Sequence, residues 1–456
     1  MRLRPSKPRL TLESLEDRIV PTFNSLFNPM TSTWYLYQAS DEGNVTISVD
    51  GSSDLIITEQ FGGTANLGNA GASLQIMMLS GTGTDLDIDL DSALTGSLHI
   101  NLGNGDRFGP SLPGNPPFTE GLEFIGSVNS IGGDLTIIAG TGIQSLNLAS
   151  DPNGAITGGA DLFVGGNAYI DLGLGFDYLM LTDDPGTFVV PRGASIGDNL
   201  TLRGVNVFEH TGFLFVGRDF SWTNNFETES NLYRAFDGTA LFPPTIAGGG
   251  FIGGNFTYRG GSLDDALFFD DVGGAVPPVI VGGNFYADLG SNFEATVPFG
   301  QQIRLEGTTI GGNVTAIAGM NPFASDLFAT DEFTVIGGNI YINFGDGIGD
   351  NPFNALPPVA SEVILLGTFG GHSILFYGST GNDSIGFGMV GNKANVSAIL
   401  GLGEDTFTLN GADGLVLAPG TAELANLYVD FGPGLDTFDN FFLLPFTFQA
   451  ILRGLP

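Results

Sequence analysis

The sequence has 456 residues, a formal net charge of −35 and no cysteine. It contains 71 glycines, and 42% of its residues are apolar while only 14% are charged. The apolar content excludes a disordered chain, and the lack of Cys excludes disulfides and Cys-ligated metal sites. The excess of acids argues against nucleic acid as a partner, and no apolar run reaches the roughly 20 residues of a transmembrane helix.

Residues 1–24 differ from the rest of the chain. They hold five of the 14 basic residues and lack the apolar stretch of an ordinary signal peptide. The segment Leu12–Pro21, LESLEDRIVP, resembles the N-terminal LE-x-LE-D/P-R-x-x-P/L motif of large surface or secreted proteins of planctomycete bacteria. The resemblance implies an export or sorting segment and an extracytoplasmic location, secreted or on the cell surface, but no activity. A charged, frayed N-terminus without a role is the alternative.

Residues 25–60 are rich in aromatic and β-forming residues, including Trp34, Tyr35 and Tyr37. Stacked β-structure exposes unpaired strand edges and core at its ends, so the ends need to be covered. We therefore expect residues 25–60 to cap the N-terminal end of the β-structure that follows.

An internal repeat dominates the remaining sequence. The unit Ile/Val-Gly-x-Asn/Asp is followed by alternating apolar residues, which predicts a sharp corner and then a short strand. The steps between copies are 20 to 36 residues, and helical periodicity is missing, so the pattern predicts an all-β parallel β-helix, or β-solenoid, over residues 25–456 as a single elongated domain. Tandem β-sandwiches are the alternative, but they rarely repeat one corner motif at eight places. The eight good copies start at Ile131, Val164, Ile196, Val216, Ile252, Val281, Ile310 and Ile336, and a weak copy starts at Phe369.

The fourth position of the repeat is an amide or a carboxylate in every good copy. If the coils stack, these side chains fall in register and can bond one coil to the next, as amide ladders do between stacked strands. The predicted structural ladder consists of Asn167, Asn199, Asn255, Asn284, Asn313 and Asn339, with Asp134 and Asp219 in the two other copies.

Glycine-rich turns that end in Asp form a second pattern, seen in LGLGFDYL (Leu172–Leu179) and LGLGEDTFTL (Leu400–Leu409). They resemble fragments of the Ca²⁺-binding nonapeptides of RTX-type β-rolls, and the resemblance implies Ca²⁺ as a ligand, since this ion prefers carboxylate and carbonyl oxygens. The nine-residue period of that family is missing here, so the alternative is an ordinary turn with a solvated Asp. The implied Ca²⁺ ligands are Asp383, Asp405 and Asp436, followed by Asp85, Asp106 and Asp177.

No catalytic or cofactor-binding residue is indicated. His99, His210 and His372 are far apart in the sequence, and none lies in a metal-binding frame. Adjacent carboxylates of the kind that glycosidases use occur, but no basic partner accompanies them and the arginines are isolated. These acid pairs are Asp183–Asp184, Asp264–Asp265 and Asp270–Asp271.

The apolar segment 439–456 is expected to cap the C-terminal end, or instead to dock a partner or an envelope component. The chain as a whole is interpreted as a non-enzymatic extracytoplasmic structural or adhesive surface protein without a cofactor. Expected partners are components of the cell envelope or extracellular matrix, or polysaccharide. A Ca²⁺-binding β-roll-like surface protein and a carbohydrate-active β-helix enzyme, a lyase or a hydrolase, are the two alternatives.

Overall fold

The computed structural model describes 27 segments of the chain, and all of the described secondary structure is β. The described residues are 23–39, 45–59, 63–71, 73–78, 86–90, 93–104, 121–125, 128–142, 144–148, 161–175, 177–181, 193–210, 213–224, 231–235, 249–261, 265–269, 278–290, 301–319, 326–344, 362–370, 373–379, 381–387, 394–409, 411–412, 415–416, 424–440 and 449–455.

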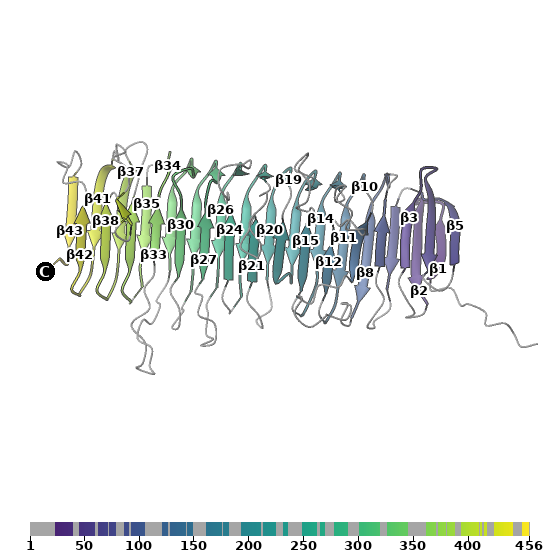
Figure 1. Ribbon diagram of the computed structural model, residues 1–456, viewed down its shortest axis with the longest axis horizontal. Coiled ribbons are helices and arrows are strands. Elements are labelled where there is room, and N and C mark those ends of the chain that lie inside the picture. The colour runs from purple at the N-terminus through teal and green to yellow at the C-terminus, as the bar shows by residue number, and fades with distance from the viewer. Residues whose placement is uncertain are drawn as a thin grey trace, which may run out of the picture.

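The described strands form three long sheets, named A, B and C, stacked side by side along a rod (Figure 1). Within the described part of the chain, sheets A and B hold 16 strands each and sheet C holds nine. Neighbours pair in parallel along most of each sheet, which confirms the predicted parallel β-solenoid.

Sheet A contains, in spatial order, β1 (Phe23–Asn28), β2 (Thr33–Gln38), β6 (Ser73–Met77), β8 (Leu98–Gly103), β11 (Leu135–Ala139), β14 (Ala168–Asp171), β17 (Leu200–Arg203), β20 (Phe220–Thr223), β23 (Phe256–Arg259), β26 (Phe285–Asp288), β29 (Val314–Ile317), β32 (Ile340–Asn343), β35 (Ser373–Tyr377), β37 (Ala394–Ile399), β41 (Leu424–Asp430) and β43 (Gln449–Arg453).

Sheet B contains β5 (Gly63–Asn69), β4 (Asp54–Glu59), β3 (Val45–Val49), β7 (Leu86–Asp89), β9 (Leu122–Ile125), β12 (Ser145–Asn147), β15 (Tyr178–Leu181), β18 (Val207–His210), β21 (Asn231–Ala235), β24 (Asp265–Phe269), β27 (Gln302–Leu305), β30 (Leu327–Thr330), β33 (Glu362–Leu365), β36 (Ser384–Phe387), β38 (Thr406–Leu409) and β42 (Thr437–Asn440).

Sheet C contains β10 (Val128–Ile131), β13 (Asp161–Val164), β16 (Gly193–Ile196), β19 (Phe213–Val216), β22 (Gly250–Ile252), β25 (Val279–Val281), β28 (Thr309–Ile310), β31 (Val335–Ile336) and β34 (Thr368–Phe369). A separate hairpin joins β39 (Gly411–Ala412) to β40 (Leu415–Val416).

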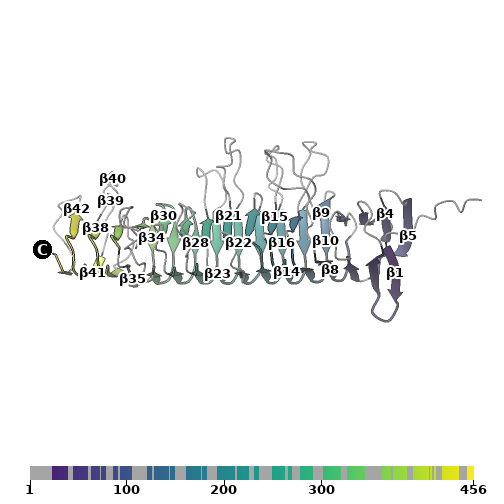
Figure 2. The same ribbon diagram turned by 90° about the horizontal axis from the view of Figure 1, so that it is seen from below.

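One coil of the central part runs through the three sheets in turn. β13 of sheet C leads through the Gly-Gly-Asn corner into β14 of sheet A, and a second glycine-rich corner leads into β15 of sheet B. In Figure 2, sheet A lies along the lower side of the rod, where β8, β14, β23, β35 and β41 are labelled. Toward both ends the described coils use sheets A and B alone, because sheet C begins at β10 and ends at β34.

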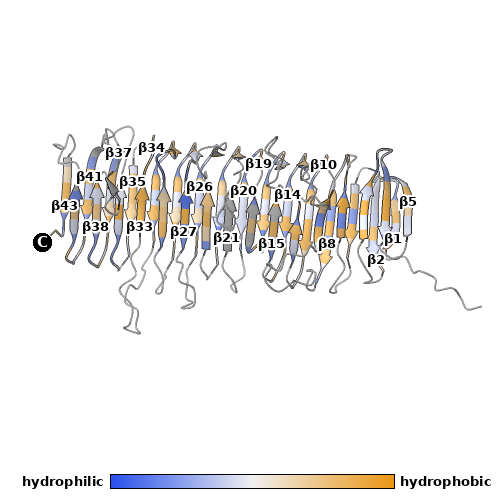
Figure 3. Ribbon diagram, in the orientation of Figure 1, coloured by the Kyte–Doolittle hydropathy of each residue, from blue (hydrophilic) through white to orange (hydrophobic). Residues whose placement is uncertain are grey.

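The interior is a continuous stack of apolar side chains, because each strand alternates inward and outward residues. Apolar residues recur from strand to strand along the whole rod (Figure 3). In the central coils the inward residues are aromatic: the Phe256 ring lies 5.0 Å from that of Phe285 and 5.2 Å from that of Phe220. Each fully buried side chain of this size contributes about 1.5–3 kcal/mol. A core of this kind needs neither disulfides nor helices.

The glycines of the repeat are required by close backbone approach. A Cβ on Gly282 would lie 2.5 Å from the carbonyl oxygen of Gly253 in the coil before, and one on Gly312 would lie 2.5 Å from Oδ1 of Asn284. At the second corner φ is positive as well, as at Gly173 (81°) and Gly401 (97°), and a Cβ on either glycine would also clash with a carbonyl oxygen of the coil before. Both corners therefore need glycine for close approach, and the second corner needs it for its φ angle too.

The two ends of the rod are built differently. At the N-terminal end β1 pairs antiparallel with β2, and β4 and β5 continue sheet B antiparallel, so the described part of residues 25–60 lies at this end of the rod. At the C-terminal end β43 pairs in parallel with β41, and β42 with β38. The described part of 439–456 therefore continues sheets A and B with parallel strands. Residues 1–22 of the expected export segment lie outside the described residues.

Because the backbones of neighbouring coils approach closely at the repeat corner, adding one methyl group there should lower stability, whereas adding it at an open position should not. Gly282→Ala should lower the free energy of unfolding by about 1–3 kcal/mol, the usual range for an overpacked site. Gly51→Ala is the matched control, because a Cβ there would meet nothing within 4 Å. Urea denaturation of both variants measures the difference; equal midpoints would show that the corner does not need glycine.

Candidate functional site

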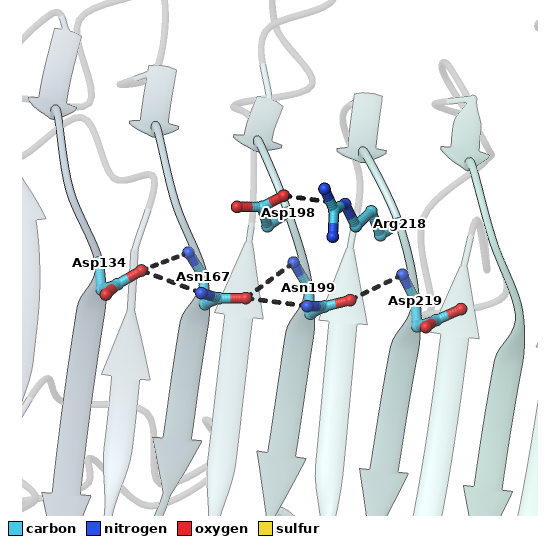
Figure 4. Close-up of polar contacts among 6 residues, drawn as sticks. All are labelled: Asp134, Asn167, Asp198, Asn199, Arg218 and Asp219. Atoms are coloured by element: carbon cyan, nitrogen blue, oxygen red, sulfur yellow. Dashed lines mark hydrogen bonds and ion pairs between the residues drawn. The ribbon is translucent and has the colours of Figure 1, made fainter.

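The six predicted ladder asparagines lie in register along the corner between sheets C and A, together with Asp134 and Asp219. Oδ1 of Asp134 accepts hydrogen bonds from the backbone N of Asn167 (2.7 Å) and from its Nδ2 (3.1 Å). Oδ1 of Asn167 accepts from N and Nδ2 of Asn199 at 3.3 and 2.9 Å, and Oδ1 of Asn199 accepts from the N of Asp219 at 3.2 Å. Figure 4 shows these four residues in a row across successive strands.

The row continues toward the C-terminus with the same polarity. Oδ1 of Asp219 accepts from N and Nδ2 of Asn255 (2.7 and 3.1 Å), and Asn255 accepts in the same way from Asn284 (2.9 and 3.1 Å). The backbone N of Asn313 donates to Asn284, and that of Asn339 donates to Asn313, both at 2.8 Å. Each side chain thus points toward the following coil and satisfies its corner amide. We call this row the outer ladder.

The outer ladder extends beyond the residues that the repeat motif marks. Oγ of Ser73 accepts from the N of Ser97 (3.1 Å), and Oγ of Ser97 accepts from the N of Asp134 (3.0 Å). Near the other end the N of Ser373 donates to Asn339 (3.0 Å), and Nδ2 of Asn426 donates to Asn395 (2.7 Å). No Ile/Val-Gly-x-Asn/Asp motif marks these residues. Ser73, Ser97 and Ser373 share a sequence signal, a small polar residue directly before an alternating strand or at its first residue, whereas Asn395 and Asn426 are the second and third residues of their strands.

An ion pair lies beside the outer ladder in the same view. Nε of Arg218 is 3.0 Å from Oδ1 of Asp198, and both side chains are exposed (Figure 4). An exposed pair of this kind contributes about 0–1 kcal/mol. It adds little to the stability of the rod.

A second polar row lies inside the rod, where each strand of sheet B begins. We call it the inner column. The backbone N of Gln144 donates to Oδ1 of Asp177 (2.7 Å), and the N of Asp177 donates to Oδ1 of Asn206 (2.9 Å). Its polarity is opposite to that of the outer ladder, since the Asp177 and Asn206 side chains each bond the coil before them. The buried members are Gln144, Asp177, Asn206, Asp265, Gln301, Asp326, Asp383, Asp405 and Asp436.

The three candidate Ca²⁺ ligands Asp383, Asp405 and Asp436 belong to the inner column. Oδ1 of Asp405 accepts from the N of Asp383 (2.8 Å), and Oδ1 of Asp436 accepts from the N of Asp405 (2.9 Å). Asp383 accepts from the N (2.7 Å) and Oγ (3.0 Å) of Ser379. The structure therefore brings the three carboxylates together on successive coils, and each binds an amide of its own corner or of the coil before.

The described residues include no group of three or more His, Cys, Asp or Glu arranged to hold a metal ion. Asp85 and Asp106 lie outside the described residues, and Asp177 stands in the inner column many coils away. In this structure the Gly-x-Gly-x-Asp sequence forms the corner that leads into a strand of sheet B. Its glycines permit the turn, and its Asp satisfies an amide that would otherwise be buried without a partner, at a cost of about 1–3 kcal/mol.

Burial raises the pKa of two carboxylates in the inner column. For Asp177 the loss of hydration raises the pKa to about 8, although the hydrogen bond from the Gln144 amide lowers it. For Asp405 burial raises the pKa to about 6, the Asp383 amide opposes this, and the charge of Asp436 adds to it. The second carboxylate oxygen of each is buried with no hydrogen-bond partner among the described residues. Protonation is therefore favoured in the folded state.

The candidates for catalysis do not meet in the described part of the chain. His372, Asp183, Asp184, Asp264, Asp270 and Asp271 lie outside it. Asp265 is buried in the inner column, and His99 stands on the outward face of sheet A, where partial burial lowers its pKa. His210 ends β18 of sheet B, and burial lowers its pKa to about 4.

Comparison of the chain with protein-family models, with curated proteins and with solved structures finds no match. In the described residues no helix has the length and apolar character needed to cross a membrane.

The outer ladder predicts a graded effect at one position. Asn284→Val removes the acceptor for the Asn313 amide and the donor to Asn255, and should cost about 1 kcal/mol for each bond lost. Asn284→Asp is the matched control, because Asp occupies this place at Asp134 and Asp219 and keeps the acceptor. Urea midpoints should fall in the order wild type, Asp variant, Val variant; a Val variant as stable as the wild type would refute the ladder's role.

The inner column predicts that folding stability falls as pH rises. The folded-state pKa of Asp177 lies above its ordinary value of 3.8, so its contribution to stability is fully present below about pH 4 and is lost as pH rises to about 8. Asp177→Asn, which mimics Asn206 one coil later, should remove most of this decline and leave the part due to Asp405, which ends near pH 6.

Urea denaturation across this pH range measures the difference between Asp177→Asn and the wild type, which should grow with pH. Glu404→Gln changes an exposed carboxylate next to Asp405 and should leave the pH profile unchanged. If stability changes with pH in the same way in the wild type and in the Asp177 variant, the pKa of Asp177 is not raised in the folded state.

Proposed function

We propose that this protein is a non-enzymatic structural or adhesive element of the cell exterior. The proposal is carried by the ladder that bonds coil to coil at the same corner along the rod, from Ser73 to Ser373. Such cross-links give a stiff, extended object whose outward faces are free to contact other molecules. Components of the cell envelope or extracellular matrix, or polysaccharide, are the proposed partners.

The charge of the chain and its first residues support the extracytoplasmic placement. A net charge of −35 keeps extended molecules soluble and apart. The LESLEDRIVP segment resembles an export or sorting motif. We favour the structural role over a Ca²⁺-binding roll, because Asp405 and Asp436 each use an oxygen to bind a corner amide.

Protease treatment of intact cells that produce the protein tests the placement. The full chain should be cleaved from outside the cell, whereas a variant with Leu12–Pro21 scrambled should be retained inside and protected. Scrambling residues 2–9, which keeps their composition and leaves Leu12–Pro21 intact, is the control and should not retain the protein. A wild-type chain that stays protected in intact cells and is cleaved only after lysis would overturn the proposal.

A further inference from the structure

Tyrosines gather on the outward face of sheet A. Strand alternation places two outward columns on this face: the first runs through Tyr169 and Tyr286, and the second through Asp171 and Asp288. Seven of the ten tyrosines of the sequence stand in these two columns. They are Tyr35, Tyr37, Tyr169, Tyr286, Tyr341, Tyr377 and Tyr428.

Three of these tyrosines each lie in a cluster with an Asp of the same strand and an Arg of a neighbouring strand, which follows in two clusters and precedes in the Tyr286 cluster. The Tyr169 hydroxyl donates to Oδ2 of Asp171 (2.9 Å), two residues along the same strand. Arg203 of the next coil pairs in register with Asp171, with Nη1 at 3.7 Å from its Oδ2 and 3.3 Å from the Tyr169 hydroxyl. Because the hydroxyl reaches the second residue along, the ring lies along the outward side of the strand.

The cluster recurs twice farther along the rod. The Tyr286 hydroxyl bonds Oδ2 of Asp288 (3.5 Å), and Arg259 pairs in register with Asp288. The Tyr428 hydroxyl bonds Oδ2 of Asp430 (3.0 Å). Arg453 pairs with Asp430, and its guanidinium lies 5.7 Å from the centre of the Tyr428 ring.

The two outward columns carry no net charge, unlike the protein as a whole. They contain three Asp and three Arg, all six in the clusters, on a chain with 14 basic and 49 acidic residues. The positions between the clusters hold mainly hydroxyl, amide and aliphatic side chains, such as Thr201, Ser221 and Thr257. An anionic polymer or an acidic membrane surface would be repelled by the −35 chain, whereas a neutral ligand would not.

The chemistry of this face fits a sugar polymer. A hexose has an apolar C–H face that packs on an aromatic ring, and hydroxyls that bond the planar groups of Asp and Arg. Neighbouring strands lie about 4.8 Å apart, so Tyr169, Tyr286 and Tyr428, four and five strands apart, are separated by roughly 19 and 24 Å along the axis. One extended chain can therefore contact more than one cluster, which multiplies weak contacts.

The N-terminal end of the same face is hollowed. Tyr35 and Tyr37 stand at the head of the two columns and line a shallow cavity of about 370 Å³ with residues of the β1–β2 hairpin. This volume is within the range of small-molecule sites, roughly 300–1,000 Å³. The other lining residues are Leu26, Phe27, Asn28 and Pro29.

We propose that the outward face of sheet A binds a neutral polysaccharide laid along the rod, with the three Tyr–Asp–Arg clusters as its contact points. This binding would supply the adhesive part of the proposed function and rests on it.

Retention of the full chain on microcrystalline cellulose and on chitin, and retardation in gels with hydroxyethyl cellulose, test the proposal. The variant is Tyr169→Thr with Tyr286→Thr and Tyr428→Thr, because Thr occupies the same column at Thr201 and Thr257. The matched control, Phe163→Thr with Phe215→Thr and Phe251→Thr, removes three rings from the outward column of sheet C, where Thr309 is native.

The wild type and the control should bind at least one neutral glycan, and the Tyr variant should bind about tenfold more weakly or less, as expected when several linked contacts are lost together. Thermal unfolding checks that each variant is folded. If the Tyr variant does not fold, Arg203→Thr with Arg259→Thr replaces it, since Thr223 stands between these arginines in the same column, and weaker binding is again expected.

Three outcomes would overturn the proposal: no retention of the wild type on any neutral glycan, equal losses in the Tyr variant and the sheet C control, or retention on polygalacturonate alone. None of these outcomes affects the protease assay on intact cells, so failure of glycan binding is distinguishable from failure of the extracytoplasmic placement.

Discussion

The structure depends on hydrogen bonding between coils at the corners, where the strands stop. The corner glycine amides still bond carbonyls of the preceding coil, as from Gly166 to Gly133, but the Asn167 amide that follows must find another acceptor. Here the acceptor is a side chain of the neighbouring coil: the following coil's amide bonds the outer-ladder residues, and the preceding coil's amide bonds Asp177, Asn206, Asp326, Asp405 and Asp436 of the inner column. Each coil supplies hydrogen-bond acceptors for the corner amides of its neighbours. The register of the stack therefore does not require loops of equal length.

The two rows use different chemistry because they lie in different surroundings. The outer ladder is exposed, and most of its members are asparagines, which accept through Oδ1 and donate through Nδ2 at once. The inner column is buried and contains several carboxylates, which accept the corner amide but leave a second oxygen without hydration. Burial then raises the pKa of Asp177 and Asp405, so the folding stability of the protein depends on pH.

The inward residues form the core, and the corner residues form the two hydrogen-bonded rows. The proposed binding therefore uses the outward columns. On sheet C the described outward column is mainly apolar, with Phe215 stacked on Phe251 at 5.4 Å. On sheet A the outward columns hold the tyrosines and the three balanced Asp–Arg pairs. If the proposed binding holds, the solenoid separates stability from recognition, since a change in an outward column leaves the core and the corners untouched.

The sequence by itself determined the all-β solenoid and the outer ladder's asparagines, because a corner with no room for a Cβ leaves the same Ile/Val-Gly-x-Asn/Asp pattern in eight copies. The inner column was not predictable as a whole, since Asp177 and Asn206 accept the preceding coil's amide with different side chains, and Gln301 at the same position donates through Nε2 to backbone carbonyls. Its acidic turns were found, but only the tertiary structure decided that their carboxylates bind corner amides. The same holds for the Tyr–Asp–Arg clusters: Arg203 is 32 residues from Asp171 in the chain, and only the register of the coils places them side by side.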